Sequence, residues 1–402
     1  MAALTACASP AARRIAAVDN AGTAGLSSER ILIATTRKPA GTGRELFSGE
    51  RAATVNHAAV TVTIPPVHKS GALERPRRGD PQPDKHFTIR DPAYLEDEAA
   101  FVEAVNTAID RSGGNQDVLV FVHGYNSGFS DSVLRFSQFA HDAGFDGATV
   151  LFSWASRGSA VEYLYDRESA TIARDGLERT LRTLTGSKAK RIHIMAHSMG
   201  NWVAMESLRQ LQIGGNPTLN GKMGEVVLAS PDIDIDVFKS QMRRLGRPDK
   251  PYNLLISRDD RALNLSQRLA GNRPRLGNYA DDAGLVDLGI VVYDLTAVAA
   301  GDRMKHGKFS DAPEIVRILG TRLRSGHQLA TNEVRFSDRL GNLTRNIGQV
   351  VVSTGDVVIH APTTVLTQPD EFITAPVRVL AGTAKAGDGD CKDCTTETAT
   401  GR

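Results

Sequence analysis

Short apolar runs alternate with amphipathic segments through the middle of the chain. Between about residues 117 and 325, each apolar run is followed by a segment whose apolar residues recur at helical spacing. This alternation predicts an α/β fold, a doubly wound and mostly parallel sheet with helices on both faces. The expected strands are 31–35, 60–64, 118–122, 149–152, 192–195, 225–228, 252–256 and 286–295. The expected helices are 94–111, 130–142, 166–186, 200–211, 234–244, 261–270 and 311–324.

The two ends of the chain lack this alternation. The first residues are rich in Ala and Ser, and the segment after about residue 382 is rich in Gly, Asp and Thr, which is typical of disorder. Between them, two strand-like runs at 349–353 and 356–360 predict a small β appendage. The expected organisation is a flexible leader at 1–29, an α/β domain at 30–325, a β-rich extension at 326–381 and a disordered tail at 382–402.

Composition excludes two classes of function. The chain has 402 residues, 41% of them hydrophobic and 23% charged, so it can bury a sizeable core. The formal net charge is only +2, so the sequence gives no sign of the strongly basic surface that binds nucleic acid. No apolar run reaches the roughly 18 residues needed to span a bilayer. Cys391 and Cys394 form a lone C-x-x-C without further metal ligands, so we expect neither a metal site nor a redox motif there.

The N-terminus carries a second cysteine pattern. Leu4-Thr5-Ala6-Cys7 resembles the lipobox of a bacterial lipoprotein, in which the cysteine is lipidated. A working signal needs an apolar segment of about 7–15 residues, and Met1 to Ala6 is too short. We hypothesise that the gene start is placed too late and that a lipid on Cys7 attaches the protein to the membrane of the cell envelope. The alternative is an ordinary disordered leader on a cytoplasmic protein.

The strongest chemical signal is Ala196-His197-Ser198-Met199-Gly200, between a buried strand and an amphipathic helix. A sharp strand-to-helix turn that exposes a serine needs small residues two positions before and after it, because larger side chains would clash. Ala196 and Gly200 meet that need. Over roughly residues 117–310 the chain therefore resembles the α/β-hydrolase superfamily, and in particular uncharacterised bacterial esterase- or lipase-like hydrolases with an A-H-S-M-G elbow. The resemblance implies that Ser198 is the nucleophile.

A second motif, His123-Gly124-Tyr125-Asn126, directly follows the strand at 118–122. In the superfamily the loop after this strand donates one N–H to the oxyanion hole, and the residue after the nucleophile donates the other. By position these donors are Tyr125 and Met199. We expect His123 to brace the loop, because the superfamily places its catalytic histidine after the nucleophile in the chain.

The superfamily's order of serine, acid and histidine leaves His306, His327 and His360 as candidate bases. His306 lies in a loop between the last strand and the last helix of the predicted domain, where the superfamily has its histidine. We therefore assign the base to His306, since a serine needs a nearby base to be nucleophilic.

The acid follows the strand at 252–256, where Asp259 and Asp260 are adjacent. The superfamily pattern favours Asp260, and the other aspartate could be the N-cap of the next helix. Asp232, after the preceding strand, occupies a position that some lipases use.

The segment after the strand at 149–152 carries aromatic residues at the same edge of the sheet. This segment resembles a pocket-lining loop of the related bacterial hydrolases, and its residues include Trp154, Tyr163, Tyr165 and Asp166. Either they line the acyl or alcohol pocket, or they pack the loop.

These residues together predict a serine hydrolase that cleaves carboxylic esters through an acyl-enzyme, acting on a small-molecule or lipid ester. No cofactor and no metal are implied. The short connection between residues 228 and 234 predicts that no large helical lid covers the site. An acyltransferase or phospholipase with the same triad remains open, as does a binding protein of the envelope that uses the fold as a scaffold.

Overall fold

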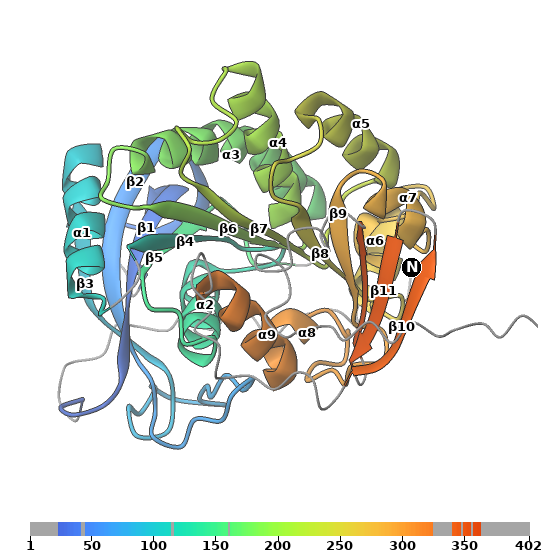
Figure 1. Ribbon diagram of the computed structural model, residues 1–402. Coiled ribbons are helices and arrows are strands. Elements are labelled where there is room, and N and C mark those ends of the chain that lie inside the picture. Colours follow the sequence, from blue (N-terminus) through green and yellow to red (C-terminus); the bar gives the residue numbers. More distant parts are fainter. Residues whose placement is uncertain are drawn as a thin grey trace, which may run out of the picture.

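The structure, a computed structural model, describes residues 23–41, 45–113, 116–159, 161–324, 340–346, 349–354 and 357–362. In these residues a twelve-stranded sheet runs through the molecule in the order β3-β2-β1-β5-β4-β6-β7-β8-β9-β12-β11-β10 (Figure 1). Neighbours are parallel from β1 to β9, and antiparallel strands extend both edges. The strands are β1 (Ser28–Pro39), β2 (Phe47–Thr63), β3 (Thr88–Leu95), β4 (Asp117–Val122), β5 (Ala148–Ser153), β6 (Arg191–His197), β7 (Met223–Ala229), β8 (Tyr252–Ile256), β9 (Ile290–Asp294), β10 (Leu340–Asn346), β11 (Gln349–Thr354) and β12 (Val357–Pro362).

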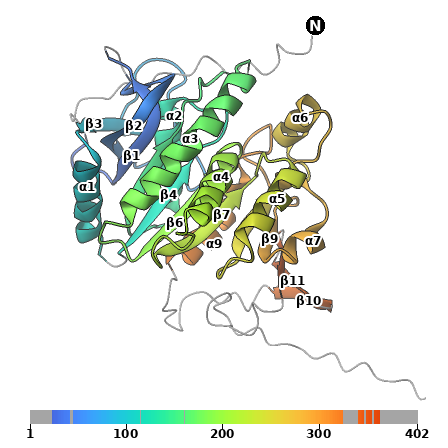
Figure 2. The same cartoon turned by 90° about the horizontal axis from the view of Figure 1, so that it is seen from above.

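Helices cover both faces of the sheet. Helices α1, α3, α4, α5 and α7 pack on one face, and α2, α8 and α9 pack on the other (Figures 1 and 2). The doubly wound α/β fold expected from the sequence is therefore confirmed. The helices are α1 (Glu98–Arg111), α2 (Phe129–Asp142), α3 (Tyr163–Leu184), α4 (Gly200–Ile213), α5 (Ile235–Leu245), α6 (Arg261–Leu269), α7 (Asp282–Val286), α8 (Lys308–Asp311) and α9 (Pro313–Arg324), with a 3₁₀ turn at Leu276–Asn278.

Strand β4 shows why this sequence forms a central strand. All of its residues are buried, and successive side chains enter opposite layers of the core. Val118 and Val120 join the cluster under α1 and α3, whereas Leu119 and Phe121 join the cluster under α2 and α9. A strand covered by helices on both faces needs apolar residues at every position, which is why it reads as a continuous apolar run.

Four strands differ from the sequence expectation. Strands β1 and β2 form a long antiparallel hairpin that extends well beyond the apolar runs at 31–35 and 60–64. Strand β3 was not expected, because four of its residues are exposed at the edge of the sheet and Pro92 interrupts its pattern. The predicted strand at 286–295 was too long, since Val286 ends α7 and β9 begins only at Ile290.

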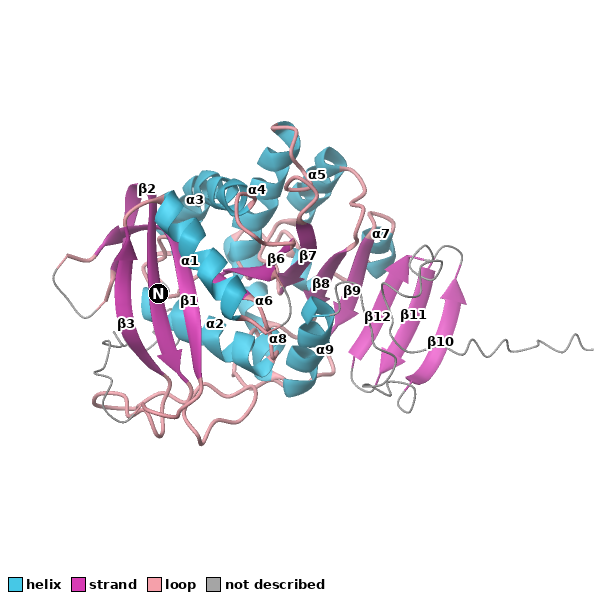
Figure 3. Ribbon diagram, turned by 60° about the vertical axis from the view of Figure 1, so that its left-hand side comes forward, coloured by secondary structure: helices cyan, strands magenta, loops and turns pink. Residues whose placement is uncertain are grey.

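Strands β12, β11 and β10 extend the sheet beyond β9 (Figure 3). The lipobox-like Cys7, the pair Cys391 and Cys394, and the alternative base His327 lie outside the described residues, so those expectations stay predictions. Within the described part of the chain, no helix has both the length and the apolar character needed to cross a membrane.

The parallel strands end at one edge of the sheet, and the loops after β4, β5, β6, β7, β8 and β9 meet there. In doubly wound sheets ligands bind beyond these carboxyl ends. Only residues 230–234 connect β7 to α5, and they contain no helix.

Candidate functional site

The turn between β6 and α4 holds Ser198 in a left-handed backbone conformation, with φ of +54°. Such a conformation is unfavourable for a residue with a side chain and costs about 1–3 kcal/mol unless its surroundings enforce it. Here the end of β7 does so, because Ala229 O accepts hydrogen bonds from Ser198 N and from Asn201 Nδ2, both at 3.0 Å. Asn201 Nδ2 also donates to Ser198 O at 3.0 Å.

Gly200 allows α4 to start against β4. A Cβ atom at this position would lie 2.4 Å from His123 O and 2.5 Å from Val122 O. Because both neighbours are backbone atoms of a central strand end, they cannot move aside cheaply. The small residue expected two positions after the serine is therefore required by a backbone contact, and Ala196, two positions before it, is fully buried.

Gly124 plays the corresponding part in the loop after β4. A Cβ atom there would lie 2.8 Å from Ser198 Cβ and 3.1 Å from His197 Nδ1. The loop and the serine turn are thus in direct contact, which places Tyr125 beside the serine. Met199, which follows the serine, is 3% exposed.

His123 and Trp154 brace this loop from below. His123 Nδ1 lies 2.9 Å from Gly124 O and donates to it, which leaves Nε2 to accept from Trp154 N at 3.1 Å. Trp154 Nε1 donates to His123 O at 2.7 Å, and the two rings stack with centroids 5.0 Å apart. Burial, and then the charge of Arg37, lower the pKa of His123 to about 3, so its ring stays neutral. Fully buried, Trp154 packs the loop.

Arg37 and Asp166 fix the far end of the same loop. Arg37, 1% exposed, donates to Ser127 O and Ser156 O, both at 2.8 Å. Asp166, fully buried, accepts from Ser156 Oγ at 2.5 Å and from Asn126 N at 3.4 Å. The sequence reasoning missed Arg37, whose only local signal is a cation directly after two threonines at the end of an apolar run.

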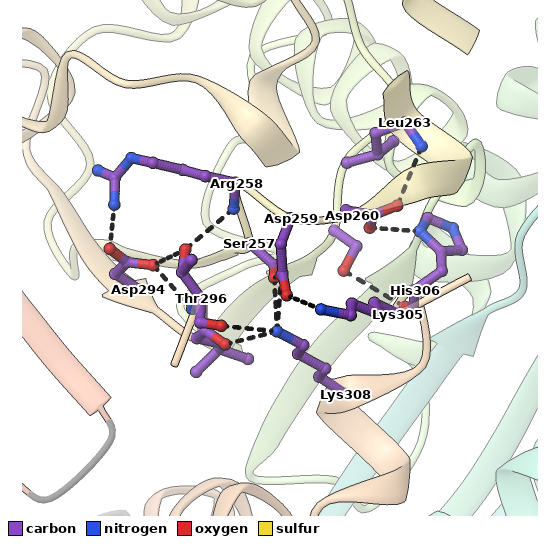
Figure 4. Close-up of polar contacts among 12 residues, drawn as sticks. Ser257, Arg258, Asp259, Asp260, Leu263, Asp294, Thr296, Lys305, His306 and Lys308 are labelled. Atoms are coloured by element: carbon purple, nitrogen blue, oxygen red, sulfur yellow. Dashed lines mark hydrogen bonds and ion pairs between the residues drawn. The ribbon is translucent and has the colours of Figure 1, made fainter. Parts of the chain in front are cut away.

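His306 and Asp260 meet at the ends of β8 and β9. His306 Nδ1 lies 2.6 Å from Asp260 Oδ2 (Figure 4). The other oxygen of the carboxylate accepts from Leu263 N at 3.0 Å, so Asp260 is also the N-cap of α6. The sequence leaves capping open between the two aspartates, and in the structure Asp260, the favoured acid, is the cap. Burial acts to lower the pKa of His306, but the charges of Asp260, Asp232 and Asp302 outweigh it and raise that pKa.

The loop that carries His306 is tied to the serine turn. His197 Nε2 lies 3.3 Å from His306 O, and the two imidazole rings are 4.6 Å apart. Burial, and then the neighbouring His306, lower the pKa of His197 well below its usual value, so His197 is a neutral donor to that carbonyl. Asp302 accepts from His306 N at 3.0 Å and from Gly307 N at 2.8 Å. No hydrogen bond joins Ser198 to His306 within the described residues, and such contacts often tighten only when substrate binds.

Asp259, the first alternative acid, points away from His306. Its carboxylate accepts from Lys305 Nζ and Lys308 Nζ, each at 2.8 Å, and from Ser257 Oγ at 2.5 Å (Figure 4). Burial would raise the pKa of Asp259, but these donors lower it to about 2. Lys308 is 1% exposed and also donates to Leu295 O at 2.9 Å. This second carboxylate therefore holds a buried lysine under the His306 loop.

Asp232, the other alternative acid, lies behind the serine. Its backbone N–H donates to Ser198 O at 3.2 Å, and its carboxylate accepts from Ser266 Oγ at 2.6 Å. Arg275 Nε is 3.2 Å from the same carboxylate oxygen. Tyr163 OH in turn lies 3.2 Å from Ser266 Oγ, and its ring meets the ring of Tyr125 edge-on at 5.3 Å.

The remaining candidate base is remote from this cluster. His360 lies in β12, opposite Val292 of β9. Among the residues that the structure describes, no group of three or more His, Cys, Asp or Glu side chains could hold a metal ion.

The protein has the fold and the local features of an α/β hydrolase. These are a mostly parallel sheet with helices on both faces, a serine on a strained strand-to-helix turn, and an aspartate–histidine pair after later strands. The family model described as "alpha/beta hydrolase of unknown function (DUF900)" matches residues 97–322, more than half of the chain. The chain therefore belongs to that family. The match runs from the N-cap of α1 into α9 and includes the cluster described above.

Similar solved structures include esterases and a lipase. A thermostable esterase from Pseudomonas putida is 13% identical, with a TM-score of 0.34, over 78% of this chain and 86% of that one. A Pyrobaculum calidifontis esterase is 14% identical, with a TM-score of 0.32, over 74% and 85%. Aspergillus fumigatus lipase B is 10% identical, with a TM-score of 0.27, over 41% of this chain, which spans 43% of that protein. No curated protein matches the chain.

Proposed function

We propose that this α/β hydrolase is a serine esterase in which Ser198, His306 and Asp260 form the catalytic triad. The observation that carries the proposal is the 2.6 Å contact between His306 Nδ1 and Asp260, in a loop tied through His197 to the serine turn. A carboxylate on Nδ1 leaves Nε2 as the nitrogen that can take a proton from a serine.

The proposed reaction begins with proton transfer. His306 removes the proton from Ser198 Oγ as that oxygen attacks the ester carbonyl. The N–H groups of Tyr125 and Met199 stabilise the oxyanion, and His306 returns the proton to the leaving alcohol. Water, activated in the same way, then releases the acid from Ser198. Asp260 stabilises the imidazolium in both halves of the reaction.

Several contacts support a rigid site. Arg37, Asp166 and His123 hold the loop at 123–127 from three sides, so that its N–H groups need no rearrangement when the oxyanion forms. The raised pKa of His306 makes its neutral form a stronger base.

The test is covalent labelling by an uncharged fluorophosphonate, followed by assays with short-chain nitrophenyl esters. We expect labelling on Ser198 that is lost in Ser198→Ala and falls at least about 10³-fold in rate in His306→Ala. Ser207→Ala in α4 and His141→Ala in α2 are matched controls, because both side chains bond other backbone or surface groups. A folded wild type that neither reacts nor cleaves esters would overturn the proposal in favour of a binding protein on this scaffold. Labelling without hydrolysis would favour acyl transfer to another acceptor.

A further inference from the structure

Arg275 is a buried cation whose hydrogen-bonding capacity is unused. The residue is 6% exposed and lies just before the 3₁₀ turn, on a segment that pairs with residues 231–235. Its Nε is 3.2 Å from Asp232 Oδ1, but the N–H is not directed at that oxygen, so the contact is an ion pair without a hydrogen bond. Within the described chain its two terminal nitrogens have no hydrogen-bond acceptor either, and unlike Nε they are not among the fully buried atoms. An acceptor from outside the protein can therefore reach them, on a side chain that is otherwise held in a buried position.

Asp232 connects this guanidinium to the reacting centre. The backbone of Asp232 is hydrogen-bonded to Ser198, and its charge contributes to the raised pKa of His306. Its carboxylate also bonds Ser266, which contacts Tyr163, and Tyr163 packs on Tyr125 of the loop after β4. Burial, and then the charge of Asp232, raise the pKa of the Tyr163 hydroxyl, so it stays a neutral donor.

We propose that Arg275 is the anion-binding residue of the substrate site, so that the preferred substrate is an ester carrying a carboxylate in addition to the scissile bond. The proposal rests on the esterase function proposed above. Two parallel N–H groups of a guanidinium match the two oxygens of a carboxylate, and such pairs are among the strongest hydrogen bonds in proteins. The contact with Asp232 holds the planar group in place, while the terminal nitrogens remain for the ligand. Two other arginines at this edge of the sheet are already engaged: Arg37 donates to several protein acceptors, and Arg258 pairs with Asp294.

The test compares two esters of the same alcohol, 4-nitrophenyl butyrate and mono-4-nitrophenyl glutarate, which differ in the terminal carboxylate. The measured quantity is the ratio of kcat/KM for the anionic ester to that for the neutral ester. We expect Arg275→Gln to lower this ratio by about 10- to 100-fold, the range for a charged bidentate hydrogen bond. Arg275→Lys should fall between the wild type and Arg275→Gln, because it keeps the charge and loses the paired geometry.

Arg273→Gln is the matched control. Arg273 lies two positions before Arg275, is exposed and pairs with Asp236. Its replacement removes the same charge and should leave the ratio of the two kcat/KM values unchanged. A ratio that moves less than about threefold in a folded Arg275→Gln would overturn the proposal. If that variant does not fold, the wild type decides: competitive inhibition of butyrate hydrolysis by glutarate supports the proposal, and no inhibition refutes it. Inhibition by inorganic phosphate alone would assign the site to phosphate and refute the carboxylate.

Failure of this inference is distinct from failure of the esterase proposal. A protein that is labelled at Ser198 and cleaves the butyrate ester, but shows no preference that depends on Arg275, is an esterase without this anion site. A protein that is not labelled and cleaves neither ester refutes the proposed function itself.

Discussion

Adjacent aspartates with different partners allow the acid of the triad to be tested by a matched pair of substitutions. Asp260 contacts His306 at 2.6 Å, whereas Asp259 contacts Lys305 and Lys308. Replacing each by Asn removes one charge with almost no change in volume. The prediction is that Asp260→Asn loses catalysis and keeps stability, whereas Asp259→Asn keeps catalysis and loses stability.

The size of the effect at position 260 follows from its two contacts. The side chain accepts from Leu263 N as helix N-cap, and Asn is about as good an N-cap as Asp, so that contact survives. The contact with His306 does not, because Asn presents an N–H or a neutral oxygen to Nδ1 and no longer stabilises the imidazolium. An equivalent change in other serine hydrolases lowers kcat about 10⁴-fold, or about 5 kcal/mol of transition-state stabilisation. Asp260→Ala should add a loss of about 1 kcal/mol in the free energy of unfolding, since it also removes the cap.

The effect at position 259 follows from Lys308, which is almost fully buried. Asp259→Asn leaves that ammonium with Ser257 Oγ and the carbonyls of Leu295 and Thr296 as acceptors, but without a counter-charge. Loss of one charged hydrogen bond of this kind costs about 1–3 kcal/mol of unfolding free energy. We expect kcat/KM to change by no more than a few-fold.

The assay measures kcat/KM on one nitrophenyl ester and unfolding by urea for the wild type, Asp260→Asn, Asp260→Ala and Asp259→Asn. The reasoning is refuted if Asp259→Asn is the inactive variant, or if Asp260→Asn retains more than about a tenth of wild-type activity. Equal loss of stability in both Asn variants would also contradict the assignment of the cap.

Two further predictions concern the oxyanion loop and the base. Gly124→Ala should lower kcat by about 10²–10³-fold, because its Cβ would lie 2.8 Å from Ser198 Cβ and displace the loop. The control Gly186→Ala should leave kcat unchanged, because its Cβ would have only Thr183 O nearby, at 3.4 Å. Steady-state kinetics would measure both effects, and circular dichroism would check that both variants fold. In the proposed mechanism neutral His306 is the active form, so kcat/KM should rise with pH through its raised pKa, with a midpoint above the usual value of about 6.5. Asp232→Asn removes a charge that raises this pKa and should move the midpoint to lower pH; an unchanged or higher midpoint in the pH profile would contradict the electrostatic account.

The features that sequence predicted well are those encoded within a few neighbouring residues. The turn at Ser198 is recognisable because strand, small residues and helix follow one another directly; Gly200 is required by a backbone contact, and Ala196 is fully buried. The same holds for the motif at His123, which directly follows a strand with an unbroken apolar run. Both signals are local, so the prediction needed no knowledge of which strands are neighbours.

The features that sequence missed depend on distant segments. Arg37 contacts Ser127 in the loop after β4, which is 90 residues away in the chain, and Ser153 and Ser156, which are 116 and 119 residues away. Arg275 is brought to Asp232 by an antiparallel pairing of two irregular segments, which has no periodic signature. The preference for Asp260 over Asp259 came from the superfamily pattern, because adjacent residues of identical type do not themselves show which side chain turns toward His306.

The same contacts support the proposed base, His306, and the strained turn at Ser198, the proposed nucleophile. His197, immediately before Ser198, donates to the backbone carbonyl of His306, while the end of β7 anchors the turn from its other side through Ala229 O. Keeping Ser198 at a positive φ costs about 1–3 kcal/mol, and these contacts offset that cost. The same contacts set the distance between Ser198 and the loop that carries His306. A change that relaxes the turn must also move the base. For that reason, activity should be sensitive to substitution of His197 and Asn201, which hold the turn and the His306 loop through backbone carbonyls.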